Sequence, residues 1–297
     1  MKSATRILAA LLCVLLLLPT VVFAEAQPSL EKQIAQSAEG MSALGGKKGE
    51  LLKDRELFPA GDSVCDWLAI AMALSGTRES YSDYLAELKA HVEDAYAKNG
   101  CLDRNKATEY HRISLTVLAL GGNPTNFGTK PDGSAIDLIA EGTYNYARDP
   151  GAQGLNGWIW ALLTLDAGDT EVPADALYSR EDMVNAISVA QEPDGGFGLI
   201  PGKSDVDITA MAVQALAPYR DQMETEIDAA LSYLSGQLTD TCGYIAYGDE
   251  NAESTAQVIL ALCALGIDPE TDSCFVKGEH TLLTELSQFR EADGTYR

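Results

Sequence analysis

The sequence predicts an all-α protein in which helical hairpins close around a common axis as an α/α toroid. Ala/Leu-rich segments that are apolar almost all round recur at spacings of about 45 to 51 residues, long enough for two helices and their loops. Amphipathic segments alternate with them, which indicates an inner and an outer layer of helices. A right-left solenoid stack is the competing arrangement. A sheet-based fold is disfavoured, because alternation of apolar and polar residues is nearly confined to 243–248.

The apolar segments each close with a leucine followed by a small residue or a turn. Because they are apolar on nearly every side, we expect them to form buried inner helices. These inner helices are expected at 66–74, 112–120, 157–165, 208–216 and 257–265.

The amphipathic segments have one apolar and one charged face, as helices of an outer layer would. They are expected at 29–44, 81–97, 134–147, 180–191, 226–238 and 279–290. There are six outer segments and five inner ones, so the sequence predicts an α6/α6-like barrel without its last inner helix. Residues 25–297 are therefore expected to be a single toroid domain, incomplete at its C-terminal end, with an apolar seam between the first and fifth inner helices.

The first 24 residues have the features of a secretory signal peptide. Lys2 and Arg6 precede an apolar run from Ile7 to Phe23, and Ala24 is a small residue at the expected cleavage point. A membrane-spanning helix is the alternative, but the run is short and no basic cluster follows it. We expect a secreted or cell-surface protein with no membrane span after signal removal.

The charge of the chain limits its partners. It has 44 acidic residues against 21 lysines and arginines, a net charge of −23. Such a surface repels phosphate backbones, so nucleic acid and anionic membranes are unsuitable partners. A small-molecule ligand or a cell-surface partner remains.

The three histidines do not cluster, and neither CxxC nor HExxH is present, so we expect no metal and no cofactor.

Candidate site residues follow from the repeat register. Counting nine residues back from the closing leucines gives Cys65, His111, Asn156 and Asp207, one from near the start of each of the first four inner helices. In equivalent hairpins these residues would surround one mouth of the toroid. They either cap the helices and offset the helix dipoles or form a polar ring that holds the polar end of a small ligand above an apolar funnel. Because Cys65 and Cys101 fall near the same end of adjacent repeats, a disulfide between them is expected.

Aromatic residues extend this candidate ligand site. Trp67 and Trp158 share one register, seven residues before their closing leucines, so they should line the lumen together if either does. Trp160, two residues further on, should point to another face. Tyr244 is a further candidate for ligand binding. Filling of the core is the alternative role for all of these side chains.

Two motifs resemble a known superfamily. The run from Gln191 to Phe197 is similar to the QxxxGxW repeat of prenyltransferases and squalene cyclases, with Phe in place of Trp. The run from Asp205 to Leu216 resembles the acid motif of class II terpene cyclases and the corresponding helix of the cobalamin carriers transcobalamin and intrinsic factor. From about residue 30 onward the chain resembles secreted prenyltransferase/squalene-oxidase-repeat proteins of Gram-positive bacteria. This resemblance implies an α/α toroid.

Departures from the cyclase motif decide between the functions that the resemblance implies. Asp207 aligns with the acid that protonates an alkene, but Ile208 replaces the aspartate that should follow it. The spacing of Ser204 and Asp207 matches a capping box, which favours a cap over a proton donor. Only 7% of residues are aromatic, few for stabilising a polyene cation.

The sequence thus favours an exported, non-catalytic binding module. A terpene cyclase/mutase-like enzyme with Asp207 as general acid and a cell-wall interaction module of a longer surface protein are the alternatives.

Overall fold

The computed structural model describes residues 29–43, 49–246 and 248–292. The chain divides into two units, 1–33 and 34–297, and the boundary lies within helix α2 (Leu30–Ala43). In the first unit the described residues comprise only the start of α2. The expected signal peptide, residues 1–24, lies outside the described residues. All features below belong to the second unit.

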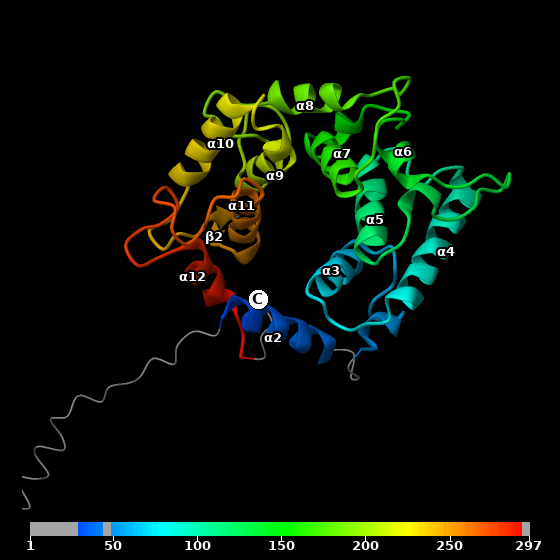
Figure 1. The fold of residues 1–297 in the computed structure, drawn as a ribbon, viewed down its shortest axis with the longest axis horizontal. Coiled ribbons are helices and arrows are strands. Elements are labelled where there is room, and N and C mark those ends of the chain that lie inside the picture. The colour runs from blue at the N-terminus through cyan, green and yellow to red at the C-terminus, as the bar shows by residue number, and fades with distance from the viewer. Residues whose placement is uncertain (1–28, 44–48, 247, 293–297) are drawn as a thin grey trace, which may run out of the picture. The chain divides into compact units, whose positions relative to one another are not determined.

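The second unit is built almost entirely from helices, as the sequence predicts (Figure 1). Each expected apolar segment is a helix, and each of these helices packs against the next one in the series. The five are α3 (Ser63–Leu74), α5 (Ala107–Ala119), α7 (Asn156–Ala167), α9 (Val206–Leu216) and α11 (Ala252–Ala264).

The amphipathic segments also contain helices, which alternate with the first set along the chain. Four of them pack against the apolar helix that precedes them in sequence: α6 on α5, α8 on α7, α10 on α9 and α12 on α11. Their bounds are α4 (Tyr81–Asn99), α6 (Leu138–Gly142), α8 (Arg180–Ser188), α10 (Glu224–Gly236) and α12 (Leu282–Leu286). The expected lengths at 134–147 and 279–290 are wrong, because α6 and α12 are much shorter.

Helix α6 is short because a side-chain cap fixes its first turn and a close tertiary contact with α5 fixes its end. Its N-cap is Asp137, whose side chain accepts a hydrogen bond from the Ala140 amide at 2.9 Å. At its other end Gly142 packs so closely on α5 that a Cβ atom there would lie 2.2 Å from the Cβ of Tyr110. The next residue, Thr143, leaves helical geometry with φ −120° and ψ −101°. Only glycine permits this close crossing, and the helix stops there.

The remaining elements are small. Strands β1 (Ile245–Ala246) and β2 (Asp249–Glu250) form an antiparallel pair, with β1 inside the stretch 243–248 where the sequence alternates in polarity and β2 just after it. Five 3₁₀ turns connect the helices in the described part of the chain: η1 (Leu51–Lys53), η2 (Pro124–Asn126), η3 (Pro150–Gln153), η4 (Ala217–Tyr219) and η5 (Ser287–Phe289).

The apolar helices are not buried on every side. Val64 and Leu74 of α3 and Leu260 of α11 are exposed, and α3 and α11 are the first and last helices of the packed series. Helices between them bury residues such as Ile159 and Val213 completely. The expectation of burial all round is therefore wrong at the two ends of the series, where each helix has one neighbour fewer.

The run from Gln191 to Phe197 joins three helices. The Gln191 side-chain amide donates hydrogen bonds to the carbonyl oxygens of Gly195, at 2.9 Å, and of Glu226 in α10, at 2.8 Å. The Phe197 ring is fully buried, and its amide donates to the hydroxyl of Thr209 in α9 at 2.8 Å. This motif follows α8 directly, so its contacts fix α8, α9 and α10 to one another.

Candidate functional site

Two pockets lie next to the first turns of α7, where η3 leads into the helix. Helix α7 and η3 are in close contact here, because a Cβ atom on Gly157 of α7 would lie 1.8 Å from the carbonyl oxygen of Pro150 in η3. Successive helical residues point in different directions, about 100° apart. As a result Leu155 and Trp158 line one pocket, whereas Asn156 and Trp160 line the other.

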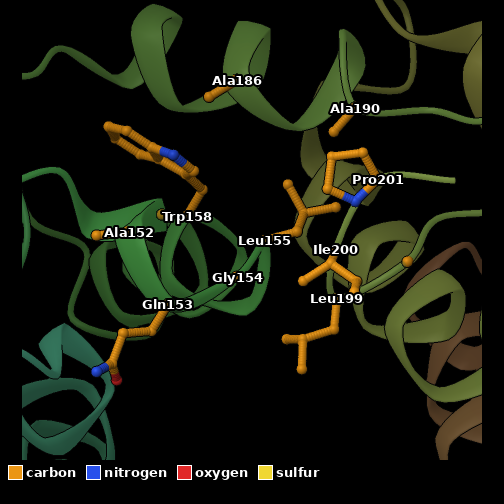
Figure 2. Close-up of a pocket in the computed structure, with 12 residues that line it drawn as sticks. Ala152, Gln153, Gly154, Leu155, Trp158, Ala186, Ala190, Leu199, Ile200 and Pro201 are labelled. Atoms are coloured by element: carbon orange, nitrogen blue, oxygen red, sulfur yellow. The ribbon is translucent and has the colours of Figure 1, made fainter. Parts of the chain in front are cut away.

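The larger pocket, called the apolar pocket here, has a volume of about 490 Å³. Figure 2 shows the Trp158 indole on one side and the segment from Leu199 to Pro201 on the other. Ala186 of α8 and Ala190, just beyond that helix, lie above them. The small alanine side chains leave the space open, so the pocket exists because large residues face small ones across it.

The walls of the apolar pocket are held by local contacts. The Leu155 amide donates to the Leu199 carbonyl oxygen at 3.0 Å, which joins the start of α7 to the loop opposite. The Trp158 ring meets the Tyr178 ring edge to face, with centroids 5.1 Å apart. The residues that line this pocket include no ionisable side chain. The lining offers mainly apolar contact, and its side chains include no acid, base or charged nucleophile.

The smaller pocket, called the polar pocket here, has a volume of about 140 Å³ and lies at the N-terminal ends of three apolar helices. Its aromatic walls are Trp67 and Trp160, whose ring centroids are 5.2 Å apart with an angle of 49° between the ring planes. Its other lining residues are polar or charged: Ser63, Thr108, Glu109, Arg112 and Asn156.

Arg112, which lines the polar pocket, is held in place by a buried ion pair with Asp66. The Arg112 guanidinium donates from Nε to Oδ2 of Asp66 at 2.9 Å and from Nη2 to the Gly61 carbonyl oxygen at 2.9 Å. Nη2 also lies 2.9 Å from Oε2 of Glu109. Asp66 has no exposed surface, and its Oδ1 accepts hydrogen bonds from the Tyr84 hydroxyl at 2.7 Å and from the Gly61 amide at 3.0 Å.

These contacts also set the charge of Arg112. Burial by itself lowers the pKa of Arg112, but the hydrogen bonds and charges of Glu109 and Asp66 outweigh burial and raise it. The guanidinium is therefore a fixed cation. Sequence reasoning assigned Arg112 no role. The available signal was a pair of opposite charges, Asp66 and Arg112, at the starts of adjacent segments that are otherwise apolar.

The structure pairs Trp67 with Trp160, whereas the sequence predicts a pairing of Trp67 with Trp158. Trp67 and Asn156 both line the polar pocket, but Trp158 lines the apolar pocket. Trp67 packs against Trp160, the residue that was expected on another face. The expectation that Trp67 and Trp158 line one space together is therefore wrong.

His111 and Tyr244 do not face either pocket described here. His111 is buried, and its Nε2 lies 2.6 Å from the Gly142 carbonyl oxygen. Burial lowers the pKa of His111 to about 4, so the ring is neutral near pH 7 and Nε2–H donates to that carbonyl. Tyr244 is fully buried, and its hydroxyl donates to the Leu234 carbonyl oxygen at 3.1 Å. The prediction that His111 lies at an open mouth of the ring is therefore wrong, and Tyr244, the further candidate for ligand binding, is likewise part of the core.

Asp207 is not the cap of its helix. The N-cap of α9 is Asp205, whose side chain accepts from the Ile208 amide at 3.0 Å. The Ser204 hydroxyl donates instead to Asp194 at 2.6 Å. The prediction of a capping box between Ser204 and Asp207 is therefore wrong. The N-cap lies one residue later than predicted, at Asp205.

Asp207 is half-buried in the first turn of α9. Burial raises its pKa, the hydroxyl of Ser254 lowers it, and the carboxylates of Asp205 and Glu253 raise it further. Its Oδ1 atom is buried and has no hydrogen-bond partner among the described residues. A carboxyl group in this setting holds a proton more firmly than an exposed aspartate. Asp207 lines neither pocket, however.

The expected disulfide is not formed. Cys65 and Cys101 are both free, as are the other three cysteines of the described chain. Cys65 is buried at the start of α3, and burial raises the pKa of its thiol to about 11, so the reactive thiolate is scarce near neutral pH. Cys101 lies just after α4 and is half-buried.

Comparisons with known protein families, with curated proteins and with solved structures find no match for this chain. Within the described ranges, no group of three or more His, Cys, Asp or Glu side chains is placed to hold a metal ion. None of the helices in those ranges has the length and apolar character that crossing a membrane requires. The two pockets are therefore the features of the described chain from which a function can be inferred.

Proposed function

We propose that this chain is an exported, non-catalytic binding module, built as an α/α toroid, that holds a small and largely apolar molecule in the apolar pocket. The resemblance of its motifs to toroidal proteins, the cobalamin carriers among them, supports the architecture. So does the packing of each apolar helix on the next along the chain. A hydrogen bond of 2.6 Å from Arg290 to Gln36 also joins the segment after α12 to α2.

The observation that carries the proposal is the apolar pocket itself. Its volume of about 490 Å³ is typical of sites that enclose small molecules, which span about 300 to 1,000 Å³. One large aromatic surface, Trp158, faces the aliphatic side chains of Leu199 and Ile200. A flat apolar ligand would fill the space between them and remove apolar surface from water, which is the main source of affinity at such a site.

Filling the apolar pocket should weaken binding. Ala186→Trp places an indole into the space opposite Trp158, and we expect it to weaken binding of the neutral fluorophore N-phenyl-1-naphthylamine at least about tenfold. The measurement is a fluorescence titration of the purified protein. The matched control is Asn185→Trp, which adds the same side chain to the exposed face of α8, next to the pocket but outside it.

Three results decide the question. Binding that is lost in the first variant and kept in the second supports the proposal, provided that both keep the helical circular dichroism of the parent protein. Equal binding by all three proteins would overturn it, because the fluorophore would then occupy another site. Absence of binding by the parent protein would overturn it as well. Mass spectrometry of small molecules that co-purify with the parent, compared with Ala186→Trp, would then identify the natural ligand.

A cyclase-like enzyme is the second candidate, and the raised pKa of Asp207 favours it. A proton donor must keep its proton until it meets the alkene, and burial of Asp207 works in that direction. We expect no cyclised product when the purified protein is incubated with squalene or shorter polyprenyl substrates and the extract is analysed by mass spectrometry. Product that disappears in Asp207→Asn would replace the binding module with the enzyme.

A further inference from the structure

The geometry points to a second binding site: we propose that the polar pocket binds one ring of a neutral saccharide, which lies against Trp67. This site is separate from the apolar pocket and does not depend on what binds there.

Three helices build the polar pocket with the same local arrangement. Each supplies a polar residue from its first turn and a larger residue one turn further on. The pairs are Ser63 with Trp67, Thr108 with Arg112, and Asn156 with Trp160. Residues four apart lie on the same face of a helix, so all three helices direct these pairs toward one space.

The aromatic wall offers a surface for a sugar ring. Trp67 is 38% exposed although it belongs to an apolar helix and packs against Trp160. The face of an indole is electron-rich, and the C–H bonds on one face of a pyranose ring carry partial positive charge, so the two surfaces attract each other. The two indole planes are tilted by 49° rather than parallel, so they do not form a slot that would hold a flat aromatic ligand between them.

The polar lining matches hydroxyl groups, which both donate and accept hydrogen bonds. The hydroxyls of Ser63 and Thr108 and the Asn156 amide can do either, and Glu109 accepts. Arg112 uses Nε and Nη2 for its contacts with the protein, and Nη1 has no partner among the described residues. The pocket therefore presents donors and acceptors together.

The charge around the pocket favours a neutral ligand over an ion. Arg112 is paired with both Asp66 and Glu109, so these three charges sum to −1, and the partial positive charge at the N-terminal ends of α3, α5 and α7 offsets that remainder. The net charge of −23 on the chain disfavours an anion. A neutral ring rich in hydroxyl groups matches a pocket whose local charges largely cancel, and a pocket of about 140 Å³ suits one ring rather than a chain of them.

Saturation-transfer NMR titrations of the full chain test this site. The probes are the methyl glycosides of glucose, galactose, mannose and N-acetylglucosamine, with cellobiose and chitobiose as dimers. We expect at least one to bind at about millimolar Kd and Trp67→Ala to weaken it at least about tenfold. Asn156→Ala should weaken it less, because it removes one hydrogen-bonding group. Ala186→Trp is the matched control and should bind the saccharide as the parent does, because it changes only the apolar pocket.

Pull-down on insoluble cellulose and chitin shows whether the bound sugar ring belongs to a free sugar or to a polysaccharide. Retention of the protein on either polymer, lost in Trp67→Ala, assigns a polymer, and binding of soluble sugars alone assigns a free one. No binding of any probe overturns the proposal, as does binding of choline chloride in place of sugars. Trp67→Ala should still bind N-phenyl-1-naphthylamine, so failure of this site and failure of the apolar pocket give different results.

Discussion

Replacing Arg112 with methionine is expected to destabilise the protein by about 3 to 5 kcal/mol, the usual effect of removing one partner from a buried ion pair. The Arg112 side chain is 7% exposed, and its partner Asp66 is completely buried. In the variant the Asp66 carboxylate keeps the Tyr84 hydroxyl and the Gly61 amide as donors but loses the only cation paired with it in the described structure. An uncompensated charge then remains in the protein interior.

Urea unfolding followed by circular dichroism measures this effect, with Arg55→Met as the matched control. Arg55 pairs with Glu87 at 3.1 Å, but its side chain is 69% exposed, so we expect a loss of less than about 1 kcal/mol there. Adding Asp66→Asn to Arg112→Met removes the unpaired charge and should recover part of the stability. A double variant less stable than Arg112→Met alone would show that the charge of Asp66 is not the cause.

Acidification is expected to destabilise the protein through His111. Its pKa is lowered to about 4 by burial in the folded protein, whereas that of a histidine in an unfolded chain is about 6.5. Between these values the unfolded chain binds a proton that the folded protein does not. The contribution of neutral His111 to stability is therefore complete above about pH 6.5 and is lost as the pH falls toward about 4. The total loss is about 3 kcal/mol.

The test compares the free energies of unfolding of wild type and His111→Gln at about pH 7 and about pH 4. Glutamine does not titrate and can still donate to the Gly142 carbonyl oxygen, so the difference between the two pH values should shrink by about 3 kcal/mol. His280→Gln, a change of an exposed histidine, is the control and should leave the wild-type difference in place. An unchanged pH difference in His111→Gln would contradict the neutral buried state.

The all-α fold could be predicted because its signal is repeated along the chain. Five apolar segments at similar spacings do not depend on any single residue, and all five are helices. Lengths of the outer helices were less predictable. Helix α6 stops at Gly142 because of its close contact with Tyr110, a tertiary contact that leaves no mark on the periodicity of the segment.

The candidate site was harder to predict, because the repeat was aligned on residues that are not equivalent. Leu74 is 76% exposed, whereas Leu165 is completely buried, so these two closing leucines do not occupy the same position in their helices. Aligned on the first residues of α3 and α7, Ser63 and Asn156, Trp67 matches Trp160, its actual neighbour. A register error of two residues rotates a helix face by about 200°, enough to move a side chain from one pocket to another.

The close contact of Gly157 with Pro150 also limits how this protein can diversify. Any side chain at position 157 would push α7 away from η3 and deform the partition that the two pockets share. Ala186 and Ala190 line the apolar pocket from the side of α8 and take no part in this contact, so their size and polarity can vary without this effect. Substitutions on the α8 side therefore change the shape of the apolar pocket alone, whereas the partition between the two pockets requires glycine at position 157.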